Sequence, residues 1–182
     1  NGDDSELFTP YPDDTDVPLI AAADGVVATG AVFLQDGTGF RDAGNEEFVA
    51  NLLDEEAGTG TVLWDEGHGQ FFDTSTHLAF TGYAENEGYD VVGTESLAAD
   101  LDGDDVTAAV VTTPAESFTD AELDAVASFV ADGGTLLLFG QSDFGGFNQP
   151  ANLNEICSAV DAPFRFNDDQ VLDFANNAGI FF

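Results

Sequence analysis

The sequence contains no lysine and no methionine, and its only arginines are Arg41 and Arg165. Against these two cations stand 36 aspartates and glutamates, which give a formal net charge of −34 at pH 7. Such a chain repels a phosphate backbone or an anionic membrane surface, and two arginines cannot form a basic groove. The composition therefore excludes nucleic acids and acidic lipid surfaces as partners.

Cysteine and long apolar runs are also scarce. The single cysteine, Cys157, excludes an internal disulfide and a cysteine-cage metal site. It stands beside Ile156 and Val160 at helical spacing, which predicts a buried small residue and not a nucleophile. No apolar run approaches the roughly 18 residues of a membrane span, so we expect no membrane insertion. We expect no cofactor, because the glycine-rich stretches 37–44 and 140–146 match neither nucleotide-binding pattern.

The acidity does not indicate a disordered tail, because 43% of the residues are hydrophobic and 17 are phenylalanine. In dilute buffer so many like charges weaken the compact state by self-repulsion. At molar salt the Debye length falls to roughly 3 Å, which screens that repulsion. Near-absence of lysine with aspartate-rich loops resembles proteins of salt-accumulating halophilic archaea, so we expect a surface solvated by K⁺ and Na⁺. The alternative is a protein that binds several calcium ions, which needs carboxylates grouped at ligand spacing.

The first third of the chain contains apolar segments after an irregular arm at 1–16. The runs 17–23 and 26–34, separated by Asp24-Gly25, predict a β-hairpin. A helix is expected to begin near Asn45, a favourable N-cap residue. Its predicted apolar face consists of Phe48, Val49, Leu52 and Leu53.

From residue 61 onward, short apolar strands alternate with helices. We predict strands at 61–66, 89–94, 106–113, 135–139 and 164–166, and helices at 76–87, from the capping box Thr119–Glu122, and at 151–160. Such alternation indicates an α/β fold with three layers: a mainly parallel, flavodoxin-like sheet covered by helices on both faces. We expect residues 17–182 to form a single domain.

Several sequence motifs in this region together resemble a known family. VLWDEGHGQFF at 62–72, the double glycine before TLLLFGQSDF, and the later NLNEIC and FRF are similar to glutamine-amidotransferase-like domains of the ThuA and GIFT type. The resemblance covers about residues 61–173. Residues 17–56 resemble the end of such a domain, although here they come first. The resemblance thus implies a circular permutation or a chain that spans two tandem copies.

Residues 17–56 are expected to complete the sheet of 61–173, within one chain or by segment exchange in a homodimer. An unpaired sheet edge invites such pairing. This arrangement predicts burial of Val26, Val27, Phe48 and Leu52 against the remainder of the protein.

Ligands of open α/β sheets bind beyond the carboxyl ends of the strands. Polar residues follow the predicted strands there and form the candidate ligand site: Asp65, Glu66, His68, Gln70, Gln141, Ser142 and Asp143. A catalytic alternative uses Ser142 as nucleophile and His68 as base, with Glu66 or Asp143 orienting the ring. Ser142 misses the G-x-S-x-G pattern by one residue. The resemblance implies a cysteine in this turn for amidotransferase activity, and the turn GQSD has none.

The acidic segment 100–105 and His77 are weaker candidates. Asp100, Asp102 and Asp104 alternate as in a calcium loop, but the EF-hand pattern fails because its sixth position is Asp105. We expect a solvated acidic turn there and assign no metal. His77, at the start of a helix, is expected to be exposed.

We therefore expect a non-catalytic, amidotransferase-like binding or assembly module of a halophilic archaeal protein, at the cell surface in preference to the cytoplasm. Its ligand is a protein or a carbohydrate, and a crevice lined by Trp64, Phe71 and Phe72 would suit a sugar. The alternative is a hydrolase that uses His68, Ser142 and nearby carboxylates. The sequence names no ligand.

Overall fold

The protein is described by a computed structural model that covers residues 18–36, 44–141 and 148–167. Its strands are β1 (Ile20–Ala23), β2 (Val26–Thr29), β3 (Thr61–Asp65), β4 (Asp90–Thr94), β5 (Val106–Thr112) and β6 (Thr135–Phe139). Its helices are α1 (Asn45–Glu56), the 3-10 helix η2 (Thr74–Thr76), α2 (Leu78–Glu87), α3 (Leu97–Asp100), α4 (Asp120–Ala131) and α5 (Pro150–Ala159).

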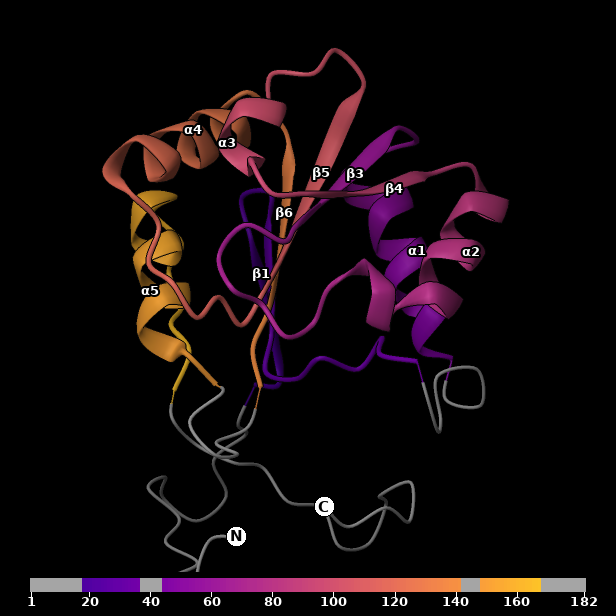
Figure 1. Cartoon of the computed structure of the whole chain (residues 1–182), viewed down its shortest axis with the longest axis horizontal. Helices are drawn as coiled ribbons and strands as arrows, with labels where there is room; N and C mark the ends of the chain where they lie inside the picture. Colours follow the sequence, from indigo (N-terminus) through magenta and orange to yellow (C-terminus); the bar gives the residue numbers. More distant parts are fainter. Residues whose placement is uncertain (1–17, 37–43, 142–147, 168–182) are drawn as a thin grey trace, which may run out of the picture.

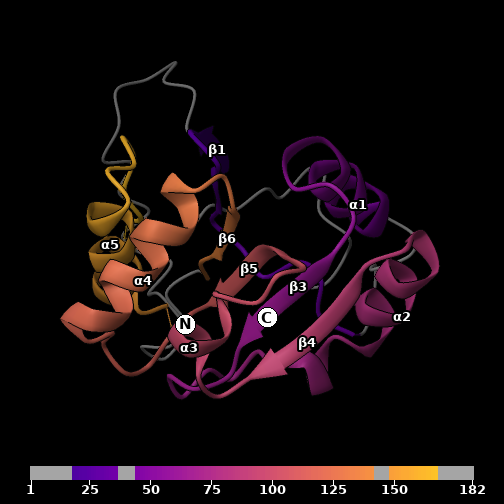
Figure 2. The same cartoon turned by 90° about the horizontal axis from the view of Figure 1, so that it is seen from above.

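The six strands form one sheet in the order β1-β2-β6-β5-β3-β4. Only the pairing of β1 with β2 is antiparallel, and the other four pairings are parallel. Helices α4 and α5 lie on one side of the sheet and α1 and α2 on the other (Figures 1 and 2). The predicted α/β fold, with a mainly parallel sheet between two helical layers, is confirmed.

Successive strand residues point into two separate cores. Leu63, Ala109 and Leu136 pack on the side of α3, α4 and α5. Trp64, Val110 and Leu137, from the alternate positions, pack on the side of α1 and α2. This alternation explains the nearly continuous apolar sequence of the central strands, since both faces are covered.

The hairpin predicted at Asp24-Gly25 is present. Both turn residues have positive φ, 48° and 80°, which suits the tight turns that connect two strands. β2 then runs parallel to β6, with Val26 opposite Leu136. Val26 is buried, so the hairpin adds to the sheet within its own chain.

Helix α1 buries Val49 and Leu53 as predicted, but its buried face is rotated away from the other two predicted residues. Phe48 is 40% exposed and packs at the flank against Phe33, while Leu52 is only partly buried. The positions that follow a spacing of three and four are the buried ones: Glu46, Val49, Ala50 and Leu53. The expectation for Phe48 was wrong because hydrophobicity alone does not fix the rotation of a short helix. The N-cap is Gly44, not Asn45.

Two other boundaries differ from the predictions. The segment 164–166 is not a strand; instead, the backbone N–H of Phe166 donates to Asn154 Oδ1 at 2.7 Å and its carbonyl accepts from Asn154 Nδ2 at 2.9 Å. Asp100 belongs to the short helix α3, which was not predicted.

Within the described ranges, no helix combines the length and apolar character needed to cross a membrane.

Candidate functional site

The candidate site lies where the strand order reverses. The chain leaves β3 for β4 on one side, and from β4 it returns to β5 on the other side of β3. The connections after β3 and β5 therefore diverge and leave a polar edge between them, the usual ligand position in open α/β sheets.

Asp65, the last residue of β3, orients the ring of His68. The Asp65 side chain is fully buried, and its Oδ2 lies 2.9 Å from His68 Nδ1. The backbone N–H of Gly67 and the side-chain amide of Gln70 also donate to this carboxylate. In return, Gln70 Oε1 accepts from the backbone N–H of His68 at 2.9 Å. These contacts bring three predicted site residues, Asp65, His68 and Gln70, together.

The two glycines that flank His68 permit this tight loop. A Cβ on Gly67 would lie 2.5 Å from the carbonyl oxygen of Glu95, so no side chain fits there. Gly69 has a φ of +67°, a conformation that other residues adopt only with strain. The sequence Gly-His-Gly thus turns the imidazole back over Asp65.

The other side of His68 is closed by the segment that leads into α4. The ring of Phe118 stacks on the imidazole with centroids 3.6 Å apart and planes 9° apart. His68 Nε2 lies 3.6 Å from Glu122 Oε1. Glu122 is itself fixed, because its other carboxylate oxygen accepts hydrogen bonds from the N–H and hydroxyl of Thr119 at 2.7 Å. His68 is consequently 7% exposed.

These surroundings favour the protonated ring. Burial on its own lowers the pKa of His68, but the hydrogen bond and charge of Asp65, together with Glu122, outweigh it and raise the pKa above its ordinary value. The pKa of Glu122 is lowered, mainly by the hydrogen bonds from Thr119 and to a smaller extent by His68. The imidazole of His68 thus lies between two carboxylates, which favour its protonated form.

Glu66 does not take part in this cluster. Its Oε1 accepts from the hydroxyl of Thr74 at 2.6 Å and from the backbone N–H of Thr74 at 3.0 Å. Its carboxylate lies against Gly93 of β4, where an added Cβ would be 2.4 Å from Glu66 Oε1. Asp65, and not Glu66, is therefore the carboxylate that orients His68.

Of the predicted site residues that follow β6, the structure describes one. Gln141 follows β6, and its Oε1 is buried without a hydrogen-bond partner among the described residues. Ser142 and Asp143 lie outside the described residues. Asp100 accepts a hydrogen bond from Thr94, and Asp102 and Asp104 are exposed. No group of three potential metal ligands occurs in the described segments.

His77 is fully buried, which corrects the expectation of an exposed residue. Its Nδ1 lies 2.7 Å from the carbonyl oxygen of Asp73, and its ring lies 4.6 Å from that of Trp64. Nε2 is buried with no partner in the described part of the chain. Burial lowers the pKa of His77, so this ring is neutral at pH 7.

Trp64, Phe71 and Phe72 do not line an aromatic crevice, which corrects a second expectation. Trp64 is fully buried and its Nε1 donates to the carbonyl of Phe72 at 3.0 Å. Phe72 is 8% exposed, so only Phe71, at 63%, presents a ring to solvent among the three. Trp64 and Phe72 belong to the core and cannot line a sugar site.

Phe118 and Glu122 were not predicted as partners of His68. The sequence signal for Glu122 was the capping box, which the structure contains, with Thr119 and Glu122 each bonding the other's backbone. Glu122, which caps α4, also faces His68 in the loop after β3. This second contact depends on the strand order and leaves no local sequence signal.

Comparison with known proteins gives one match. A family model described as a domain of unknown function (DUF4350) matches residues 76–173, just over half of the chain. Neither a curated protein nor a solved structure matches.

Proposed function

The chain belongs to the DUF4350 family of domains of unknown function, and we propose that it is a non-catalytic binding module. The observation that carries this proposal is the engagement of both ring nitrogens of His68 by carboxylates. Nδ1 faces Asp65 at 2.9 Å and Nε2 faces Glu122 at 3.6 Å. A general base needs an unprotonated nitrogen within reach of the reacting group. His68, held between Asp65 and Glu122, instead links the loop after β3 to helix α4.

The single cysteine supports the same proposal. Cys157 is fully buried in α5, and burial raises the pKa of its thiol to about 11. A thiol in that state is not a nucleophile at neutral pH. We propose that the chain shares the architecture of amidotransferase-like domains without their glutamine hydrolysis.

The charge indicates where the module works. With a net charge of −34, we propose that it is adapted to molar salt as part of a halophilic archaeal protein at the cell surface. A protein partner is favoured over a carbohydrate, because Trp64 and Phe72 are occupied in the core.

A hydrolase is the second candidate, and the Asp65–His68 pair favours it. A buried carboxylate that orients a histidine is the arrangement of hydrolases in which that histidine activates a serine. For this role Nε2 of His68 has to be free of Glu122 and in contact with the Ser142 hydroxyl.

The two proposals separate in one assay. Hydrolysis of nitrophenyl esters, an anilide and glutamine is measured in molar KCl for the unaltered chain and for His68→Ala and Ser142→Ala. The binding proposal predicts background rates for all three proteins. Turnover by the unaltered chain that both substitutions abolish, with unchanged circular dichroism, would establish the hydrolase instead.

A further inference from the structure

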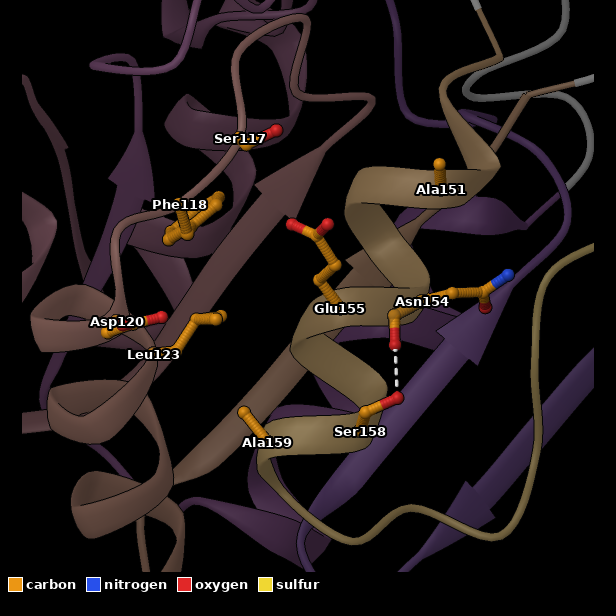
Figure 3. Close-up of a pocket in the computed structure, with 9 residues that line it drawn as sticks. All are labelled: Ser117, Phe118, Asp120, Leu123, Ala151, Asn154, Glu155, Ser158 and Ala159. Carbon is orange, nitrogen blue, oxygen red and sulfur yellow. Dashed lines mark hydrogen bonds between the residues drawn. The ribbon is translucent and has the colours of Figure 1, made fainter.

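A groove of about 740 Å³ lies between α4 and α5, on the side of the sheet that carries these two helices (Figure 3). Leu123 and Phe118 line it from α4 and the segment before it, and Ala151 and Ala159 line it from α5. Its volume falls within the usual range of about 300–1,000 Å³ for ligand sites. The groove is open along its length, so it suits an extended partner better than an enclosed small molecule.

Both walls of the groove are fixed by contacts outside it. Asn152 of α5 donates to the carbonyl of Pro114 at 2.8 Å and accepts from the hydroxyl of Ser117 at 3.1 Å, which ties the two walls together. Phe118 is held from behind by the stacked ring of His68. A preformed surface of this kind binds with little ordering cost.

Carboxylates face the groove from opposite walls. Asp120 lies at the start of α4, and Glu155 extends from α5 toward Ser117 and Phe118 (Figure 3). The carboxylates of Asp120 and Glu155 form no hydrogen bond or ion pair with any other residue that the structure describes. The groove therefore combines apolar side chains with two carboxylates that stand on opposite walls.

The chain itself has little to supply as that cation. Of its two arginines, Arg165 donates to the carbonyl oxygens of Ala162 and Phe164, and Arg41 lies outside the described residues. A second copy brings only the same two arginines. A different molecule has to provide the positive charge.

We propose that the α4–α5 groove is the docking site for a segment of a partner protein that presents one arginine or lysine beside an apolar side chain. The apolar side chain lies on Leu123 and Ala159, and the cation lies between Asp120 and Glu155. The inference rests on the proposed binding function and names its surface. Molar salt screens long-range attraction, but it leaves the contact pair and the apolar burial in place.

The test uses a short fluorescein-labelled peptide that contains Leu-Arg-Ala-Leu, titrated into the full chain in molar KCl. Fluorescence anisotropy gives the affinity, and amide NMR shifts locate the contact. Glu155→Gln should weaken binding about three- to fivefold. Ala151→Phe, at an exposed position, should fill the groove and weaken binding by about tenfold or more. Asp124→Asn is the matched control, because it removes the same charge from the exposed side of α4.

Equal weakening by Glu155→Gln and Asp124→Asn would overturn the proposal, since it would reveal nonspecific attraction to an acidic surface. Equal affinity for a peptide with norleucine in place of arginine would overturn it, because the cation would then be dispensable. Equally tight binding of butylguanidinium would overturn the need for a peptide segment. NMR shifts away from residues 117–123 and 151–159 would place the contact outside the groove. Failure of peptide binding with hydrolysis still at background refutes only the groove. Hydrolysis that requires His68 and Ser142 refutes the non-catalytic proposal whether or not the peptide binds.

Discussion

The ring of Phe118 lies flat on the imidazole of His68, with centroids 3.6 Å apart and planes 9° apart. Phe118 also lines the α4–α5 groove from its other side. One aromatic side chain thus separates the buried acid–histidine cluster from the open groove.

Glu122→Gln should lower the pKa of His68 while it keeps the cap of α4. Glutamine can replace glutamate in a capping box, but it removes the negative charge that faces Nε2. Thr119→Ala is the matched comparison: it should cost about 1 kcal/mol of stability through the lost cap and leave the pKa of His68 raised. Proton NMR titration of the His68 ring measures both. A pKa of His68 that is unchanged in Glu122→Gln would exclude the ion pair.

His77 should make the protein acid-labile. Burial lowers the pKa of His77 in the folded state. As the pH falls, the imidazole therefore binds a proton in the unfolded state before it does so in the folded state. The stability that neutral His77 contributes is fully present above the unfolded pKa of about 6.5 and is lost as the pH falls below it. His77→Gln should flatten the dependence of the unfolding free energy on pH in this window. The result against this explanation is an unaltered slope in denaturant titrations of a folded variant.

Leu53→Ala should lower the free energy of unfolding more than Phe48→Ala, because Leu53 lies on the buried side of α1 and Phe48 at its exposed flank. Leu53 is fully buried, so its truncation should cost about 2–5 kcal/mol. Phe48 is 40% exposed, and its truncation should cost clearly less despite the larger side chain. Chemical denaturation of both variants measures the difference. A larger loss for Phe48→Ala would contradict the observed rotation of α1.

Salt should stabilise the fold strongly. Because 36 acidic residues repel one another with only two arginines to offset them, thermal unfolding in about 2–4 M KCl should occur well above that in dilute buffer. The comparison is made after treatment with a chelator. Equal stability in dilute, chelator-treated buffer would oppose halophilic adaptation, and rescue by millimolar calcium alone would favour cation sites.

The sequence predicts those features that depend on local pattern. The apolar run at β6 and the capping box of α4 each specify their element from neighbouring residues. The start of α2, predicted at residue 76, lies at Leu78. Its capping carboxylate comes from Asp36, which accepts from the N–H groups of Leu78 at 2.9 Å and Ala79 at 2.7 Å. A cap supplied from 42 residues away leaves no local signal.

The same distinction applies to the site. The spacing of Asp65, His68 and Gln70 within one short loop makes their association predictable. The stacking of Phe118 and the approach of Glu122 depend on the placement of the N-terminal end of α4 beside the loop after β3, which no local pattern specifies. His77 was misjudged because a polar residue at a helix start is usually solvated, whereas this one lies beneath Trp64.

The protonation of His68 is the most direct test of the non-catalytic proposal. Nitrogen-15 NMR of the imidazole, recorded across a pH titration in molar KCl, reports the state of Nδ1 and Nε2 separately. The account predicts a pKa above the ordinary value of about 6.5, with protons on both nitrogens at lower pH and a loss of the stabilising pair as the pH rises through that raised pKa. A pKa at or below the ordinary value, with Nε2 unprotonated at pH 7, would contradict the ion pair and would leave this nitrogen able to act as a general base.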